Sequence, residues 1–232
     1  MKRIRWIRVL VLAIALCLSD QTVSVIAGDV LVHDSDYDYD PPVPGSYTLP
    51  VIKVAPDGAI VDSDSKFRNL HELTHGSITV LSFIYTRCAA PKACPYASGV
   101  LSQLHELSGK DNQLAKNMRL ISLSFDPNYD TPQRLAAYSE GMHEQKSGCD
   151  WRFVTAKSHD ALDSILNGYG QAVDKRSNPN DPQGPFYHIL RVFLIDREGR
   201  IRNIYSSATL DPRLVLSDVK TLLLEEKKLS TR

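Results

Sequence analysis

Hydrophobic and polar residues follow two different spacings along most of this chain. The run from Ile78 to Tyr85 is almost continuously apolar, which is typical of a strand covered on both faces. Four further runs with the same β-type character predict strands, and the last two of them predict a hairpin across Arg197-Glu198-Gly199: Leu120–Phe125, Trp151–Val154, Leu190–Ile195 and Ile201–Tyr205.

Helical spacing fills the intervals between these runs. It predicts helices over about Tyr96–Leu107, from Thr131 with Pro132 at the first position, over about Asp160–Leu166 with its end at Gly168 or Gly170, and over about Pro212–Lys228. Strands that alternate with helices and end in a hairpin predict an α/β protein, a thioredoxin-like mixed sheet flanked by helices.

Turn and loop residues divide the rest of the chain. Pro56-Asp57-Gly58 separates Tyr47–Val54 from Ala59–Asp62, which predicts an N-terminal β-hairpin extension. Residues 28–45 are acidic and rich in proline, so we expect an extended, solvated linker there. Residues 174–185 contain Asn, Asp, Pro and Gly in a density that predicts a loop.

The N-terminus has the pattern of an export signal. Basic residues up to Arg8 precede the apolar run Val9–Leu18, and Val25-Ile26-Ala27 offers a cleavage site, so residues 1–27 are predicted to be a signal peptide. A retained N-terminal membrane anchor is the alternative, but ten apolar residues are short for a spanning helix. The expected location is therefore outside the cytoplasm, in the periplasm.

Net charge narrows the classes of partner. The whole chain has 27 basic and 27 acidic residues, and residues 1–27 hold four of the basic and one of the acidic ones, which leaves 23 against 26. A formal charge of about −3 gives no reason to expect nucleic acid as a partner. Hydrophobic residues make up 43% of the chain, enough for an ordinary core.

Two cysteines stand out as candidates for chemistry. Cys88 and Cys94 lie in a loop rich in Pro and Ala between a buried strand and a helix, where open α/β sheets place their sites. A thiol near a helix N-terminus, close to Arg87 and Lys92, should have a lowered pKa. Thiolates favour Cu(I) and can also form a disulfide. An inert structural disulfide is the alternative. Because only five residues separate the two cysteines, this disulfide would close a small loop and would stabilise the fold little.

A histidine is the third candidate. His188 follows the predicted loop and precedes the strand Leu190–Ile195, which in a thioredoxin-like plan lies beside the strand that ends at the cysteine loop. Its imidazole could therefore face the thiols. A lone histidine at a strand end can equally be an ordinary polar residue.

Taken in order, these segments resemble the Sco/SenC family of copper-binding thioredoxin-like proteins over about residues 45–225. The match consists of four stretches: Phe83–Cys88 with Cys94-Pro95, Ser122–Pro127 with Asp130-Thr131-Pro132, Tyr138, and His188 five residues before Phe193–Asp196. The resemblance implies that Cys88, Cys94 and His188 bind copper, as Cu(I) or Cu(II), and that residues 46–232 form the Sco domain.

The resemblance also implies partners. The family is associated with maturing the dinuclear copper centre of cytochrome c oxidase, as copper donor, thiol reductant or both. We therefore expect a cuproprotein client, such as a cytochrome c oxidase subunit, a thiol–disulfide partner, and a monomeric state. One feature departs from the family pattern, because five residues separate Cys88 from Cys94 where three are usual.

Two aspartates have weaker assignments. Asp126 follows a predicted strand and could tune the copper loop from outside the ligand set. Asp130 directly precedes Thr131-Pro132, where an acidic side chain is typical of a helix entry, so capping and turn formation are the expected roles.

Two other patterns are expected to be inert. His71-Glu72-Leu73-Thr74-His75 fits the zinc-protease string HExxH, but Gly76 follows at once and a strand begins soon after, so the segment forms only about one helical turn. Cys149 precedes a strand and is expected to be a buried thiol, with a role as resolving cysteine left open.

The sequence is also compatible with two other functions. A metal-free thiol–disulfide oxidoreductase would use the same two cysteines without copper. A peroxidase of the peroxiredoxin type would need Thr86 and Arg87 gathered around one activated cysteine, and the Pro-x-x-x-Thr-x-x-Cys pattern is missing.

Overall fold

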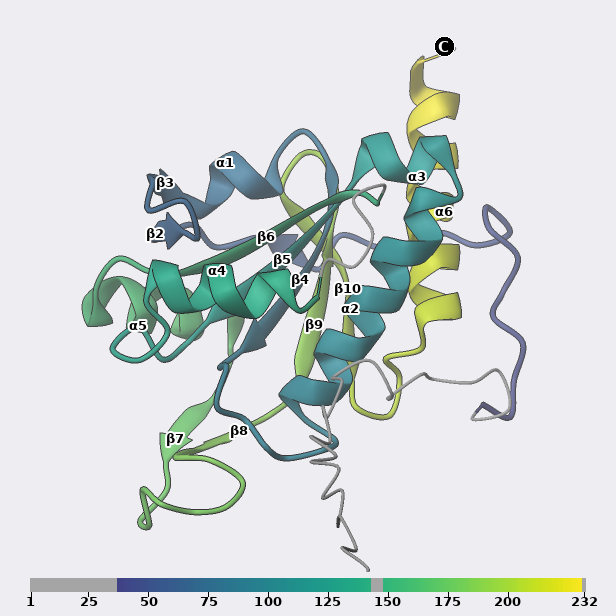
Figure 1. Ribbon diagram of the computed structural model, residues 1–232. Helices are drawn as coiled ribbons and strands as arrows, with labels where there is room; N and C mark the ends of the chain where they lie inside the picture. Colours follow the sequence, from purple (N-terminus) through teal and green to yellow (C-terminus); the bar gives the residue numbers. More distant parts are fainter. Residues whose placement is uncertain (1–36, 143–147, 231–232) are drawn as a thin grey trace, which may run out of the picture.

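A mixed eight-stranded sheet forms the centre of the protein (Figure 1). The structure is a computed structural model that describes residues 37–142 and 148–230. The strand order is β1-β10-β9-β4-β5-β6-β2-β3. Their bounds are β1 Lys53–Val54, β2 Ala59–Asp62, β3 Phe67–Asn69, β4 Ile78–Ile84, β5 Met118–Ser124, β6 Asp150–Ala156, β9 Arg191–Ile195 and β10 Arg200–Ser206.

The three central strands β4, β5 and β6 are parallel, and the strands on either side run antiparallel to their neighbours. All seven residues of β4 are buried, as its continuous apolar sequence predicts for a strand covered on both faces. β9 pairs antiparallel with β4, so β9 begins at the edge of the sheet where β4 ends.

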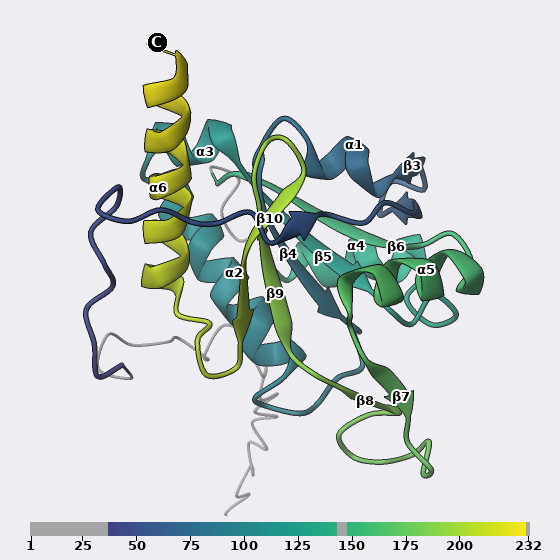
Figure 2. The ribbon, with the colours of Figure 1, turned by 180° about the vertical axis from the view of Figure 1, so that it is seen from behind.

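Helices cover both faces of the sheet (Figures 1 and 2). On one face, α2, α4 and α6 pack against residues such as Val80, Leu120 and Val192. On the other, α1 and α5 pack against Leu81, Ile121 and Phe193. The helix bounds are α1 Leu70–Thr74, α2 Cys94–Gly109, α3 Asn112–Asn117, α4 Pro132–Glu140, α5 His159–Tyr169 and α6 Pro212–Ser230.

Local sequence explains where several of these helices begin and end. Thr131 caps α4 by accepting a hydrogen bond from the Arg134 N–H, with Pro132 in the first turn. Ser158 caps α5 in the same way, and α5 ends at Gly170, whose φ of +66° is the left-handed conformation that glycine adopts at helix ends.

The fold class predicted from the sequence is confirmed, but the pairing of the N-terminal strands is wrong. β1 and β2 do not form a hairpin with each other, because β1 pairs with β10 and β2 pairs with β3 and β6. They lie on opposite sides of the central strands. The hairpin that does form joins β2 to β3, so the turn at Pro56-Asp57-Gly58 is a crossover between distant strands.

Part of the predicted linker is seen in contact with the domain. Residues 37–45 contain no helix or strand. The Tyr37 hydroxyl donates to the Leu210 carbonyl, and the Gly45 N–H donates to the Thr221 hydroxyl on α6. The described end of this segment is therefore docked on the domain rather than freely solvated. The division at residues 45 and 46 remains a prediction.

A small second sheet stands apart from the main one. β7 (Val173–Lys175) and β8 (Phe186–His188) pair antiparallel and hold the predicted loop between them. Figure 1 shows this hairpin beside the loop that joins β4 to α2. The hairpin is what carries His188.

No helix among the described residues is long and apolar enough to span a membrane. The predicted signal peptide, residues 1–27, lies outside the part of the chain that the structure describes.

Candidate metal centre

The site lies at the carboxyl end of β4. Cys88 follows this strand in a loop, and Cys94 is the first residue of α2. His188 ends β8, three residues before β9 begins at Arg191. Because β9 runs antiparallel beside β4, the chain brings His188 to the edge where the cysteine loop begins.

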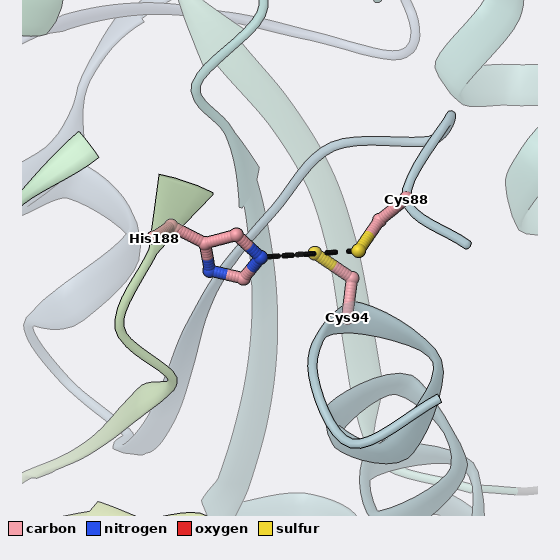
Figure 3. Close-up of side chains that lie close together, drawn as sticks. All are labelled: Cys88, Cys94 and His188. Atoms are coloured by element: carbon pink, nitrogen blue, oxygen red, sulfur yellow. Dashed lines mark hydrogen bonds between the residues drawn. The ribbon is translucent and has the colours of Figure 1, made fainter. Parts of the chain in front are cut away.

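The three side chains point toward one another (Figure 3). The Nε2 atom of His188 is 3.5 Å from the Sγ atom of Cys94 and 3.8 Å from the Sγ atom of Cys88. All three donor atoms lie within 4.8 Å of one another. Within the described residues, no other group of three or more His, Cys, Asp or Glu side chains is close enough to share a metal ion.

This spacing fits a metal ion. With the bond lengths found at zinc sites, roughly 2.3 Å to sulfur and 2.0 Å to nitrogen, tetrahedral or trigonal angles separate the two donors by roughly 3.5 to 3.7 Å. The two nitrogen–sulfur distances in the structure differ little from that range. Two thiolates and one imidazole form a soft donor set of the kind that suits copper.

Hydrogen bonds and burial set the two thiols apart. Cys88 is partly exposed. Its pKa is lowered to about 4, mainly because it accepts a hydrogen bond from the Cys94 thiol, and His188 and backbone N–H groups add to this effect. Burial acts in the opposite direction but is outweighed. Cys94 is 2% exposed, and this burial raises its pKa. At neutral pH, Cys88 is therefore the thiolate and Cys94 the thiol that donates to it.

Aromatic rings fix the orientation of His188. Its ring centroid lies 5.7 Å from that of Tyr85 and 5.2 Å from that of Phe125. The Nδ1 atom is buried and has no hydrogen-bond partner among the described residues. Metal-binding histidines usually donate this second N–H to a carboxylate or carbonyl. Here, ring packing takes over the orienting role, and sequence spacing gave no signal for either aromatic neighbour.

Asp126 reaches the site indirectly. Its carboxylate is 2.5 Å from the guanidinium of Arg87, which stacks 4.0 Å from the centroid of the Tyr129 ring. Arg87 precedes Cys88 in the chain, so Asp126 contacts the loop and none of the three donor atoms.

Asp130 does not have the capping role expected for it. Thr131 caps α4, whereas the buried Asp130 carboxylate accepts hydrogen bonds from the Thr86 N–H at 3.0 Å and from the hydroxyls of Thr86 and Ser124. Its partner in the cysteine loop is 44 residues away in sequence. A local motif cannot reveal a contact of that kind.

The other two candidates lie apart from the site. Cys149 is 2% exposed, and burial raises its pKa to about 11. It precedes the first residue of β6, at the opposite end of the parallel strands from the cysteine loop, and seven residues of strand span roughly 20 Å. It cannot act as a resolving thiol in this conformation.

The first four residues of the HExxH segment lie in the short helix α1, as expected, and His75 follows the helix in an extended conformation. Its two imidazoles have protein partners: His71 Nε2 lies 2.8 Å from the Ala55 carbonyl, and His75 Nδ1 lies 3.0 Å from the His71 carbonyl. Glu72 turns back to accept from the Asn69 N–H as part of a capping box. No catalytic zinc arrangement forms there.

Two thiols and an imidazole therefore meet at the carboxyl end of the central strand of a thioredoxin-like domain, in a group that could hold a metal ion. A model of the SCO1/SenC family matches residues 59–224. The chain belongs to this family, as the sequence resemblance indicated.

Relatives agree with this assignment. The SCO1 protein homolog of Bacillus subtilis (strain 168) is 24% identical over 161 residues, which cover 69% of this chain and 78% of that protein. A crystal structure of copper-bound ScoI from Arabidopsis thaliana superimposes with a TM-score of 0.62 at 18% identity, covering 74% of this chain and 99% of that one.

BsSco is a third protein with a similar structure. The structure of BsSco, described as a member of the Sco family of cytochrome c oxidase assembly proteins with a disulfide switch, superimposes with a TM-score of 0.58 at 21% identity. It covers 75% of this chain and 96% of that one. These structural similarities establish the thioredoxin-like fold.

Proposed function

We propose that this protein is an exported, periplasmic copper chaperone that binds one copper ion through Cys88, Cys94 and His188. The observation that carries the proposal is the convergence of these three side chains, with all donor atoms within 4.8 Å of one another. Family membership supports copper as the metal, since ScoI of Arabidopsis thaliana has been solved with copper bound.

The three ligands have different roles in this proposal. The two thiolates hold Cu(I), and the imidazole completes a site that also accepts Cu(II). Copper displaces the thiol proton of Cys94, so binding releases a proton and weakens at low pH. The longer loop between the cysteines gives Cys88 more freedom than Cys94, which is the first residue of α2. Cys88 is therefore the ligand that leaves first during transfer.

The same cysteines could act as a reductant. In a dithiol–disulfide exchange, the Cys88 thiolate attacks a disulfide of the client, Cys94 then closes an internal disulfide, and the client leaves as a dithiol. Two electrons pass to the client, and both thiolate ligands are lost from the copper site. Metal transfer and client reduction would thus be coupled.

The client we propose is a cuproprotein such as a subunit of cytochrome c oxidase. The supporting observation is that BsSco is described as belonging to a family of cytochrome c oxidase assembly proteins. Asp126 would contribute through its ion pair with Arg87, by holding the loop next to Cys88.

Anaerobic titration of the reduced protein with Cu(I), against a competing chelator, tests the ligand assignment. We expect one copper per chain and at least a tenfold loss of affinity in Cys88→Ser, Cys94→Ser and His188→Ala. Cys149→Ser is the matched control and should bind as the wild type does. Unchanged affinity in the first three variants would refute the assignment.

A metal-free thiol–disulfide oxidoreductase is the second candidate, favoured by the lowered pKa of Cys88 beside a second thiol. It predicts a reversible two-electron couple and client exchange without tight copper binding, so the same titration separates the two. The peroxidase alternative has no support, because the Thr86 hydroxyl donates to Asp130 and Arg87 pairs with Asp126. Neither is directed at a peroxide site.

A further inference from the structure

The loop that carries Cys88 has one fully buried anchor. Asp130 lies in the segment between β5 and α4, and its side chain is 0% exposed. Its Oδ2 atom accepts from the Thr86 N–H and from the Ser124 hydroxyl, and its Oδ1 atom accepts from the Thr86 hydroxyl. Thr86 is therefore held through both its backbone and its side chain by one carboxylate.

The helix itself does not need this carboxylate. α4 is capped by Thr131, whose hydroxyl accepts from the Arg134 N–H. A second capping group would direct its oxygens at the first turn of α4, whereas both oxygens of Asp130 are directed at the cysteine loop and the end of β5. Charge-assisted hydrogen bonds of this kind are stronger than neutral ones.

The anchor lies close to the metal centre along the chain. Thr86 is two residues before Cys88, and the Cys88 N–H donates to the Tyr85 carbonyl at 3.1 Å. Of the other contacts to this loop, the Arg87–Asp126 pair involves an arginine side chain that is 39% exposed. The Ala89 N–H reaches the Gln183 carbonyl at 3.4 Å. Asp130 is thus the anchor best protected from water.

We propose that Asp130, acting through Thr86, is a positioning residue that holds Cys88 in reach of Cys94 and His188. The inference rests on the proposed function for the identity of the metal, and it deepens that function by assigning what keeps the longer loop in register. Loss of the anchor frees Cys88 from the other two ligands and leaves the fold in place.

Thr86→Val tests this with little change of shape, since it removes the hydroxyl and keeps the N–H bonded to Asp130. Thr86→Ser keeps the hydroxyl and should restore wild-type behaviour. Asp130→Ala removes the whole anchor. Thr131→Val is the matched control, because it removes a hydroxyl from the neighbouring cap without touching the cysteine loop. If Asp130→Ala fails to fold, Thr86→Val decides the question.

Two measurements are made on each folded variant. The first is Cu(I) affinity, measured by chelator competition. Mutation of a residue that supports a metal ligand typically lowers metal affinity about 10- to 100-fold. We expect a loss of about tenfold in Thr86→Val and a larger loss in Asp130→Ala. The second uses phenylarsine oxide on the copper-free protein. Arsenic forms one bond to each of two thiol sulfurs, and the two thiol protons leave with the oxygen as water, so tight binding requires Cys88 and Cys94 to be held together.

We expect arsenical affinity to fall in parallel with copper affinity, and to stay at the wild-type level in Thr86→Ser and Thr131→Val. Wild-type affinity for both probes in folded Thr86→Val and Asp130→Ala would overturn the proposal, even if their melting temperatures fall. If the wild type binds the arsenical but no copper, the proposed function fails. In that event the arsenical series alone still decides the role of Asp130.

Discussion

Removal of the Cys94 thiol should slow the reaction of Cys88 with electrophiles at low pH. The largest cause of the lowered Cys88 pKa is the hydrogen bond that it accepts from Cys94. In Cys94→Ala that donor is gone, and the pKa of Cys88 rises toward the value near 8.5 of an ordinary thiol. Cys94→Ser keeps an O–H donor at the same place and should retain part of the effect.

The size of the effect follows from the thiolate fraction. At pH 5, a thiol whose pKa is about 4 is about nine-tenths ionised. A thiol with a pKa near 8.5 is ionised to about 3 parts in 10,000, roughly 3,000-fold less. The more acidic thiolate is intrinsically less nucleophilic by about 100-fold over 4.5 pKa units. Cys88 in the wild type should therefore react about 30-fold faster at pH 5 than in Cys94→Ala.

The assay is alkylation of the reduced, copper-free protein by iodoacetamide between pH 5 and 8, with the modified cysteine identified by peptide mass spectrometry. The wild-type rate at Cys88 should be nearly constant over this range, while the Cys94→Ala rate should rise about tenfold per pH unit until near the thiol pKa. A wild-type rate that also rises tenfold per unit from pH 5 would refute the hydrogen-bond explanation.

Three further outcomes can be checked. Cys149→Ser should leave disulfide formation between Cys88 and Cys94 unchanged in a glutathione redox buffer, because Cys149 lies at the opposite end of the sheet; a changed equilibrium would contradict that placement. Phe193→Ala should lower the free energy of unfolding by about 3 to 5 kcal/mol in urea titrations, since the ring is fully buried, and a loss below about 1 kcal/mol would be inconsistent with this packing. Gly184→Ala should weaken copper binding, measured by chelator competition. Gly184 has a φ of +100°, and an added Cβ atom would lie 2.3 Å from the hydroxyl oxygen of Tyr85, whose ring packs against His188. Wild-type copper affinity in this variant would show that the loop adapts.

Much of the fold follows from patterns that are local in sequence. The buried run that forms β4 and the Gly170 end of α5 are visible without a structure, because burial on both faces and left-handed turns restrict the residues allowed. The cysteine loop could also be placed, since a thioredoxin-like order puts it at the carboxyl end of a central strand.

The pairing of strands that are distant in sequence could not be predicted from local patterns. The segment at Lys53–Val54 has a β-type sequence followed by a turn, and the nearest partner along the chain is Ala59–Asp62. The actual partner is β10, almost 150 residues further on, because the sheet had an open edge there. Nothing in a local pattern distinguishes these two choices.

The candidate site shows the same division. Cys88 and Cys94 could be chosen for their place before a helix, whereas the orientation of His188 depends on ring contacts with Tyr85 and Phe125. The sequence around Asp130 predicts a role in the neighbouring helix entry, because the contact of Asp130 with Thr86 exists only after β4 and β5 have paired.

The antiparallel pairing of β9 with β4 has a consequence for when the protein can hold metal. His188 is separated by 94 residues from Cys94 and by 100 from Cys88, so the imidazole joins the thiols only once the sheet has closed. Packing of the hydrophobic core, rather than metal binding, offsets the chain entropy that is lost when these distant segments come together. An unfolded or partly folded chain could bind copper only through the two cysteines. Full copper affinity would therefore require a completely folded domain. By mass action, every ion bound in this way also stabilises the folded chain that binds it.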